Sequence, residues 1–363
     1  MTRQGIRGAL AVVVPAWVTA RLLVGVGWLV AELLADGDEP RALGRGLLAW
    51  DGDWYRSLMV HGYDGMPLES VRFFPGYVFL SRAVDAVVPG GQTTALLVVS
   101  NLGTLVAMVL LHRLVLLESS DIGIARRAVW ALALFPPAFV LVWAYSEGPF
   151  LAMVVGCLLL LRRERWWEAA LLAAGAACVR PTGALLMVPA LCAVARPSAP
   201  GRGMAGRAAA VVAGPLSAGG YVLWASLHFD EPFAPLTMQR RLRGDPVDPV
   251  RRLWEGLGEL FGPDALGDGL HIVAVAALIV VLVVLARSWP LRYGAFAGAC
   301  LVVALAGDNL NSLERYSLNG VPIVLGVATM AGHRRLGGLV PLCLLYTSPS
   351  PRDVEESRMP SSA

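Results

Sequence analysis

Long apolar stretches separated by short polar connections run through almost the whole chain. In chain order they cover residues 9–34, 71–90, 93–112, 128–142, 147–161, 167–179, 184–195, 208–227, 270–286, 293–306 and 317–332. A simple membrane-spanning helix needs about 20 predominantly apolar residues, and several of these stretches are shorter. We therefore expect an all-α polytopic membrane protein with about 9–11 membrane helices, some of them bent or continuous with their neighbours.

Composition supports this prediction, because the chain is 56% hydrophobic and only 16% charged. All thirty basic residues are arginine, and the net charge of +3 says little about partners, so we predict a membrane environment and no nucleic-acid partner. The cysteines lie within apolar stretches and the histidines are scattered. Neither set has the spacing of metal ligands, so we expect packed, reduced thiols and no histidine metal site.

Arginine-rich connections mark the cytoplasmic side of a membrane protein. Here they contain Arg3, Arg7, Arg113, Arg126, Arg127, Arg162, Arg163, Arg165, Arg196, Arg202, Arg207, Arg287, Arg292, Arg334 and Arg335. Placing these inside leaves the turns around residues 51–53, 145–147, 180–183, 227–269 and 312–316 outside. Almost every other polar cluster then falls on one, extracytoplasmic, face.

One segment conflicts with this topology. If 35–70 is outside and 113–127 inside, an odd number of crossings separates them, yet both 71–90 and 93–112 are apolar. Either 71–90 enters the membrane without crossing it, or one arginine signal misleads.

Two longer polar connections interrupt the apolar pattern. The first, 35–70, contains an amphipathic stretch around Trp54 and Leu58 that is suited to a membrane surface. The second, 227–269, contains Pro232, Pro235, Pro246 and Pro249 and one apolar-periodic segment, which predicts a partly ordered loop with one short helix.

Asp51 and Asp53 are the candidate catalytic residues of the first external connection. Carboxylates at a membrane edge are retained when they are solvated, paired or functional. The two positions share a face on a strand but not on a helix. The alternative is structural, with one of these carboxylates capping a helix that begins near Trp54.

Charged and aromatic side chains recur at the other external turns. Arg180 follows an apolar run and precedes Pro181, and its planar donor fork fits a phosphate or a carboxylate. One interpretation is donor-phosphate binding by Arg180, Arg315 and His228, with Trp50, Tyr145, Glu147 and Tyr316 contacting substrate. The alternative for Arg180 is a salt bridge to Glu147 or to an acid of the first connection.

Together these motifs resemble a known family. Trp50-Asp51, His61-Gly62-Tyr63, Phe73-Phe74-Pro75, Tyr145-Ser146-Glu147 and Arg180 with Gly183 occur in the order seen in PIG-V type mannosyltransferases, over most of residues 45–320. The resemblance implies a GT-C membrane fold, a polyprenyl-phosphate sugar donor and an acid in the first external loop as the functional carboxylate. Asp51 matches that acid.

The predicted function is a membrane glycosyltransferase that moves a sugar, with mannose implied by the resemblance, to a lipid-linked or glycan acceptor on the outer face of the cell membrane. No cofactor is predicted. One divalent cation held by Asp51 and Asp53 stays open as an alternative. The competing class is a lipid-linked sugar flippase or another transporter, which more often places charges near the membrane midplane or shows paired half-repeats.

The end of the chain departs from the apolar pattern. Residues 344–363 are polar and resemble the translation of a sequencing adaptor, so we expect a non-native or disordered tail there. Residues 1–343 are then expected to form one transmembrane domain that is truncated after about Cys343.

Overall fold

The structure, a computed structural model, describes residues 3–34, 46–195, 203–262, 268–307, 310 and 313–333. Within these ranges the regular secondary structure is entirely helical, which confirms the predicted all-α class. The longer helices are α1 (Arg3–Leu34), α4 (Gly91–Ser119), α6 (Glu147–Arg162), α7 (Trp166–Val179), α9 (Met204–His228), α12 (Asp268–Ser288) and α13 (Leu291–Leu305). The shorter ones are α2 (Asp51–His61), α3 (Pro75–Asp85), α5 (Ile122–Ala133), α8 (Met187–Val194), α10 (Ala234–Arg243), α11 (Pro249–Glu259), α14 (Leu313–Ser317) and α15 (Ile323–Ala331).

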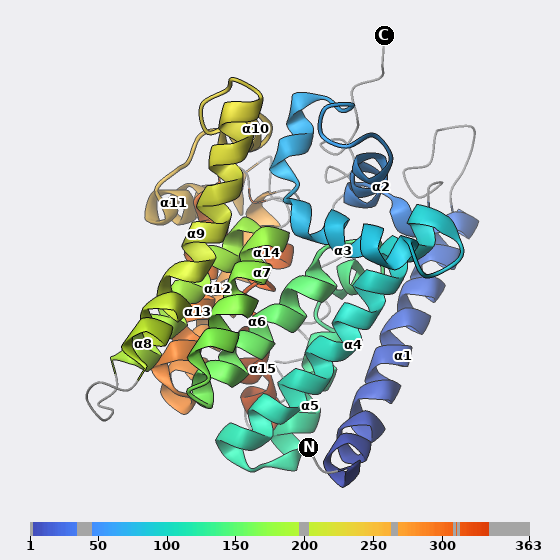
Figure 1. Cartoon of the computed structure of the whole chain (residues 1–363). Helices are drawn as coiled ribbons and strands as arrows, with labels where there is room; N and C mark the ends of the chain where they lie inside the picture. Colours follow the sequence, from blue (N-terminus) through green and yellow to red (C-terminus); the bar gives the residue numbers. More distant parts are fainter. Residues whose placement is uncertain are drawn as a thin grey trace.

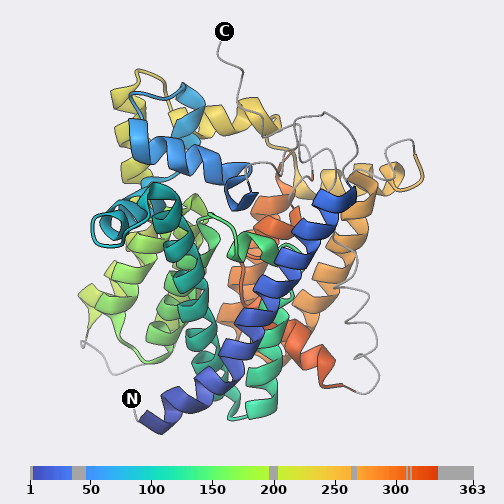
Figure 2. The same ribbon diagram turned by 90° about the vertical axis from the view of Figure 1, so that its right-hand side faces the viewer.

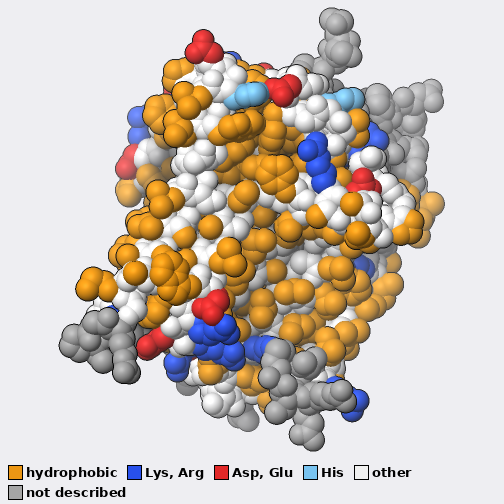
Figure 3. Space-filling model, in the orientation of Figure 1, with side chains coloured by type: hydrophobic (Ala, Val, Ile, Leu, Met, Phe, Trp, Pro, Cys, Tyr) orange, Lys and Arg blue, Asp and Glu red, His pale blue; other side chains and the backbone are white. Residues whose placement is uncertain are grey.

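The bundle has the surface of a multi-pass membrane protein. Four helices of the described residues are long and apolar enough to cross a bilayer, over Arg7–Val30, Gly91–Ser119, Met204–His228 and His271–Ser288. The space-filling view shows hydrophobic side chains over the middle of the molecule, with charged groups mainly toward its two ends (Figure 3). The number of helices that cross the membrane stays a prediction, because several apolar segments form helices too short to span alone.

Segment 71–90 is not a simple span. It contains the end of the 3-10 helix η2 (Leu68–Arg72) and the whole of the 11-residue α3. At 1.5 Å per residue α3 is about 16 Å long, whereas the hydrocarbon core is about 30 Å thick. In both ribbon views α3 runs across the ends of the bundle rather than along it (Figures 1 and 2). This arrangement favours the alternative in which 71–90 does not cross the membrane, because the candidate span between the first connection and the arginines at 113–127 is then α4.

The polar connection 227–269 contains two helices, not the single one expected. Pro235 and Pro249 lie in the first turns of α10 and α11, where a missing backbone N–H costs nothing. The side chain of Asp248 caps α11 by accepting hydrogen bonds from the backbone N–H groups of Val250 and Arg251. The prolines that indicated a loop are therefore helix-start signals.

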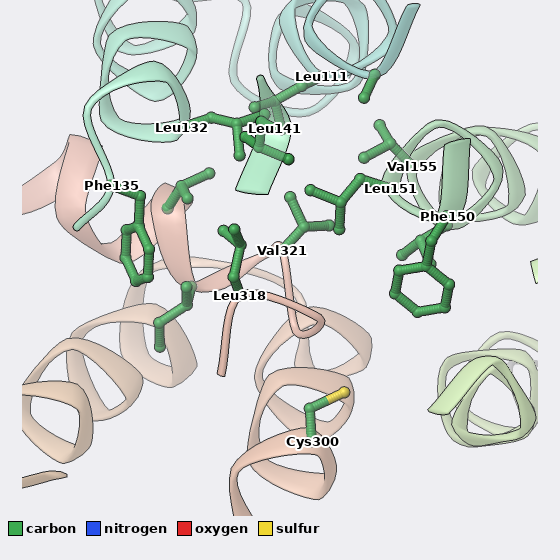
Figure 4. Packing of buried hydrophobic residues seen from close by; sticks show 14 of the residues in the cluster. Leu111, Leu132, Phe135, Leu141, Phe150, Leu151, Val155, Cys300, Leu318 and Val321 are labelled. Carbon is green, nitrogen blue, oxygen red and sulfur yellow. The ribbon is translucent and has the colours of Figure 1, made fainter. Parts of the chain in front are cut away.

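The amphipathic stretch of the first connection is helix α2, as expected, but its apolar side chains face protein. Trp54, Tyr55, Leu58 and Met59 are all buried in the main hydrophobic core. That core continues under the charged turns, where Leu318 and Val321 lie near Leu141 and Leu151 (Figure 4). α2 is therefore fixed on the bundle, and the core supports the segment that follows α14.

Charges at the end of the bundle opposite α2 are paired. Glu118, near the end of α4, forms a salt bridge with Arg162 at 3.1 Å and accepts hydrogen bonds from the Tyr293 hydroxyl at 2.9 Å and from Arg292. The cluster joins the ends of α4 and α6 to the start of α13. In the middle of the bundle, Arg21 of α1 donates to the Asn101 side chain at 2.9 Å, so it faces the bundle.

The expectation of a non-native or disordered tail over 344–363 lies outside the described residues. The boundary of the transmembrane domain at residue 343 lies outside them as well. Both stay predictions.

Candidate active site

Four separate segments bring two acids and two arginines together. Asp51 is the first residue of α2, and Glu147 is the first residue of α6. Arg180 lies between α7 and the 3-10 helix η4 (Pro181–Leu186), and Arg315 lies in α14. From their shared side of the membrane, these turns are predicted to line one cavity. The ion pairs confirm that they come together, whereas the cavity and its outward placement stay predictions.

Glu147 is the centre of the cluster. Its Oε1 forms a salt bridge with Arg180 Nη1 at 2.8 Å and accepts a hydrogen bond from Arg315 Nε at 2.6 Å. The side chain is fully buried, and among the described residues Oε2 has no hydrogen-bond partner. A buried carboxylate is costly unless it is paired, so the two guanidinium groups are what make this position stable.

Asp51 shares Arg315 with Glu147. Its Oδ2 accepts a hydrogen bond from Arg315 Nη2, and its side chain keeps 21% of its surface exposed. Burial on its own raises the pKa of the Asp51 carboxyl, but the charge and hydrogen bond of Arg315 outweigh it, and the pKa is lowered. Asp51 is therefore an ionised, partly accessible carboxylate at neutral pH.

Aromatic rings enclose the arginines. The Arg315 guanidinium lies 4.5 Å from the Tyr145 ring centroid, and both guanidinium groups lie 6.0 Å from that of Tyr316. Trp50 stacks on Trp143 with ring centroids 5.0 Å apart. Tyr145 and Tyr316 thus belong to the charged cluster, whereas Trp50 lies in the aromatic group beside it.

Two side chains at the site were not predicted. Ser146 Oγ accepts a hydrogen bond from Arg180 Nη1 at 2.9 Å and another from the Tyr55 hydroxyl at 3.0 Å. Ser146 lies inside the Tyr-Ser-Glu motif and could have been identified from its position between two candidates. Tyr55 carried no comparable signal, because its pattern within α2 is that of a core residue.

Asp53 and His228 lie apart from this ion-pair cluster. Asp53 forms a salt bridge with Arg56 at 3.0 Å one turn further along α2. The N-cap residue of α2 is Trp50, so neither aspartate occupies the capping position that was the structural alternative. His228 Nε2 lies 2.6 Å from Asp64 Oδ1, and the His228 ring stacks on Trp224 at 5.0 Å.

A cation shared by Asp51 and Asp53 does not fit this arrangement. The two side chains are paired with different arginines, and as members of one helix they do not share a face. The described part of the chain contains no group of three histidine, cysteine, aspartate or glutamate side chains arranged to hold a metal ion.

Comparison with known proteins identifies the fold. No protein-family model and no curated protein matches the sequence. The structure is similar to the crystal structure of ArnT from Cupriavidus metallidurans bound to undecaprenyl phosphate, with a TM-score of 0.51 and 14% sequence identity. The match covers 90% of this chain and 62% of ArnT, so the chain spans less than two thirds of the length of ArnT. This likeness shows the GT-C fold that the motifs implied.

Proposed function

We propose that this protein is a membrane glycosyltransferase that transfers a sugar from a polyprenyl-phosphate donor. The observation that carries the proposal is the cluster of Asp51, Glu147, Arg180 and Arg315 at one end of a GT-C fold. It combines a partly exposed carboxylate with two planar cations suited to phosphate. The undecaprenyl phosphate bound to ArnT supports this donor class.

In the proposed reaction an acceptor hydroxyl attacks the anomeric carbon of the sugar. The new carbon–oxygen bond forms as the bond from the anomeric carbon to the phosphate oxygen breaks, with inversion at that carbon. The hydroxyl proton passes to Asp51, a general-base contribution of about 10²–10⁴-fold. Arg180 and Arg315 stabilise the charge that develops on the departing phosphate.

The Arg315 guanidinium connects donor binding to the basicity of Asp51. Arg315 lowers the pKa of Asp51 while it is bonded to that carboxylate. A donor phosphate competes for the same N–H groups, and each bond it takes from Asp51 raises the pKa of that carboxyl and its basicity. Donor binding would thus activate the base that serves the acceptor.

The remaining parts of the proposal rest on the sequence. Mannose as the sugar follows from the PIG-V resemblance, and transfer on the outer face follows from the arginine distribution. We propose Tyr145 and Tyr316 as substrate contacts, because they lie against the arginines, and Trp50 as a more distant one. The acceptor is a lipid-linked or glycan hydroxyl.

Membranes containing the protein should transfer label from a polyprenyl-phosphate mannose to a lipid or glycan, and Asp51→Asn should abolish transfer. The amide keeps the shape of the side chain and removes the proton acceptor. Membrane content measured in parallel separates lost chemistry from lost protein. Full activity of Asp51→Asn together with an inactive Asp53→Asn would move the base to Asp53.

The test also separates the enzyme from the transporter. In sealed vesicles a flippase would move the labelled lipid between leaflets without forming a new glycosidic bond. That outcome would overturn the proposed reaction, whatever the response to Asp51→Asn.

A further inference from the structure

Helix α11 carries an apolar stripe that no part of the described protein covers. Val250, Trp254, Leu257 and Phe261 are 74%, 78%, 48% and 89% exposed. At 100° per residue, Val250, Trp254 and Leu257 fall within about 60° of one another around the helix axis. Three large apolar side chains are therefore presented together on one side of α11, and Phe261, in the turn just after the helix ends, is counted with this stripe.

The rest of α11 divides into two other faces. The protein face contains Gly256, where an added Cβ would lie 2.2 Å from Ile272 Cδ1, and the buried Arg252, which pairs with Glu259 at 3.2 Å. The water face contains the exposed pair Arg251 and Glu255, 2.7 Å apart. The apolar stripe lies between these two faces. The helix therefore has one side that packs on protein, one charged side in water and one exposed apolar side.

The depth of α11 is fixed by what it touches. Ile272 is the second residue of the apolar span His271–Ser288. The backbone N–H of Val247, just before α11, donates to the carbonyl of Ala306, immediately after α13, at 2.9 Å. α11 therefore lies across the outer ends of α12 and α13, where the apolar spans give way to polar loops (Figures 1 and 2).

We propose that the apolar stripe of α11 inserts into the outer leaflet of the bilayer, so that the helix lies in the headgroup region as an interfacial anchor. The stripe continues the lipid-facing surface of the spans below it, where Val273 near the start of α12 and Val302 and Val303 near the end of α13 are exposed. Interfacial helices bury such a face about 5–10 Å into the boundary between headgroups and acyl chains, with their charged face in water.

The test places an environment-sensitive fluorophore on cysteine at two positions, Trp254→Cys on the stripe and Arg251→Cys on the water face, in lipid nanodiscs. Wild-type protein labelled in parallel measures the background from the native cysteines. Relative to the 251 label, the 254 label should emit at shorter wavelength and be quenched more strongly by lipids brominated near the headgroup end of the acyl chain. Phe261→Cys is a second stripe position in case Trp254→Cys lowers folding.

Three results would overturn the proposal. Emission and quenching of the 254 and 261 labels equal to those of the 251 label would show that the stripe lies in water. A blue shift that grows with protein-to-lipid ratio and ignores the brominated lipid would assign the stripe to a second copy of the chain. A shift that appears only after undecaprenyl phosphate is added would assign it to a polyprenyl chain.

Discussion

At the scale of single residues, one cation is shared by two acids. Arg315 contacts the buried Glu147 through Nε and the partly exposed Asp51 through Nη2. Glu147 has a second cation in Arg180, whereas Arg315 dominates the charge environment of Asp51. Removing Arg315 should therefore change Asp51 far more than Glu147.

This asymmetry gives a prediction for Arg315→Gln. In the native protein the Asp51 pKa lies below its usual range near ~3.9, so the carboxylate stays ionised and activity should persist well into acid pH. Without Arg315, burial raises the pKa of the Asp51 carboxyl. The acid limb of the pH profile, where kcat/KM falls as the pH is lowered, should therefore move to higher pH. The measurement is the position of that limb, which does not depend on the accompanying fall in maximal rate.

Arg56→Gln is the matched control, because Arg56 pairs with Asp53 and not with Asp51. We expect its acid limb to stay at the native pH. A limb that moves with Arg56 and not with Arg315 would identify Asp53 as the titrating base.

Variants of Arg180 distinguish its proposed role in phosphate recognition from its salt bridge with Glu147. Arg180→Lys keeps a positive charge near Glu147 but loses the planar fork, so the KM for a polyprenyl-phosphate sugar should rise, by about tenfold if one charge-assisted hydrogen bond is lost. Arg180→Ala should also lower the amount of folded protein, because it leaves Glu147 with a single cation. An unchanged donor KM in both variants would show that Arg180 has a structural role alone, as the salt-bridge partner of Glu147.

Much of this site could be predicted from the sequence, because its residues stand out chemically in an apolar chain. Asp51, Glu147, Arg180 and Arg315 are charges at the ends of apolar runs, and the arginine distribution placed their turns on one side. The salt bridge between Arg180 and Glu147 is the structural alternative that the sequence offered. The sharing of Arg315 between Glu147 and Asp51 did not follow from local pattern, since it depends on contacts across as many as 264 positions. Tyr55 was missed because an aromatic residue in a buried helix carries no sign of its hydrogen bond.

At the scale of helices, close approach of backbones positions the charged turns. A Cβ on Gly103 of α4 would lie 2.4 Å from the backbone nitrogen of Pro149 in α6. A Cβ on Gly183, three residues after Arg180, would lie 2.3 Å from the backbone nitrogen of Ala177 in α7. Each glycine lets a neighbouring helix or turn approach next to a residue of the site.

We expect Gly183→Ala to destabilise the protein by about 1–3 kcal/mol, the usual cost of overpacking, because backbone atoms of α7 cannot move aside. The shift should also disturb Arg180 and raise the donor KM. Thermal unfolding in detergent and donor kinetics measure the two effects.

Gly219→Ala in α9 is the control, since nothing lies within 4 Å of its added Cβ. It should be neutral or slightly stabilising, because alanine favours a helix over glycine. Equal unfolding temperatures for the two variants would show that the turn at Gly183 adapts to a side chain.

Sequence patterns predicted where the apolar helices occur better than they predicted the length and orientation of each helix. The apolar runs correspond to helices, but α3 is too short to cross and lies across the bundle end, which periodicity alone does not reveal. α10 was missed because Pro232 and Pro235 favoured a loop, although a proline in the first turn is compatible with a helix. Length and orientation depend on packing partners far away in the sequence.

At the scale of the whole molecule, the bundle is closed by charge clusters at opposite ends. One is the candidate active site. The other is Glu118 with Arg162, Arg292 and Tyr293, which ties the ends of three helices together. Glu118 lies near the end of α4, at the end of the bundle opposite α2 and Asp51, so the second cluster should contribute to stability without contacting substrate.

Glu118→Ala should lower stability by about 3–5 kcal/mol, because Arg292 would be left buried without its carboxylate. The expected signature is a lower unfolding temperature with an unchanged donor KM in the folded fraction. Glu168→Ala, which breaks the exposed pair with Arg165, should change neither quantity. A large change in donor KM for Glu118→Ala would show that the two ends are coupled.

The long separations within the site set an order for its assembly during synthesis. Glu147 and Arg180 are 33 positions apart in neighbouring helices, so their salt bridge can form as soon as α6 and α7 are inserted together. Asp51 emerges first but must wait for Arg315, which leaves the ribosome 264 residues later. A nascent chain therefore lacks the hydrogen-bonded cation of Asp51 until nearly all the described helices are made. Only the completed bundle brings the proposed base under the control of its arginine.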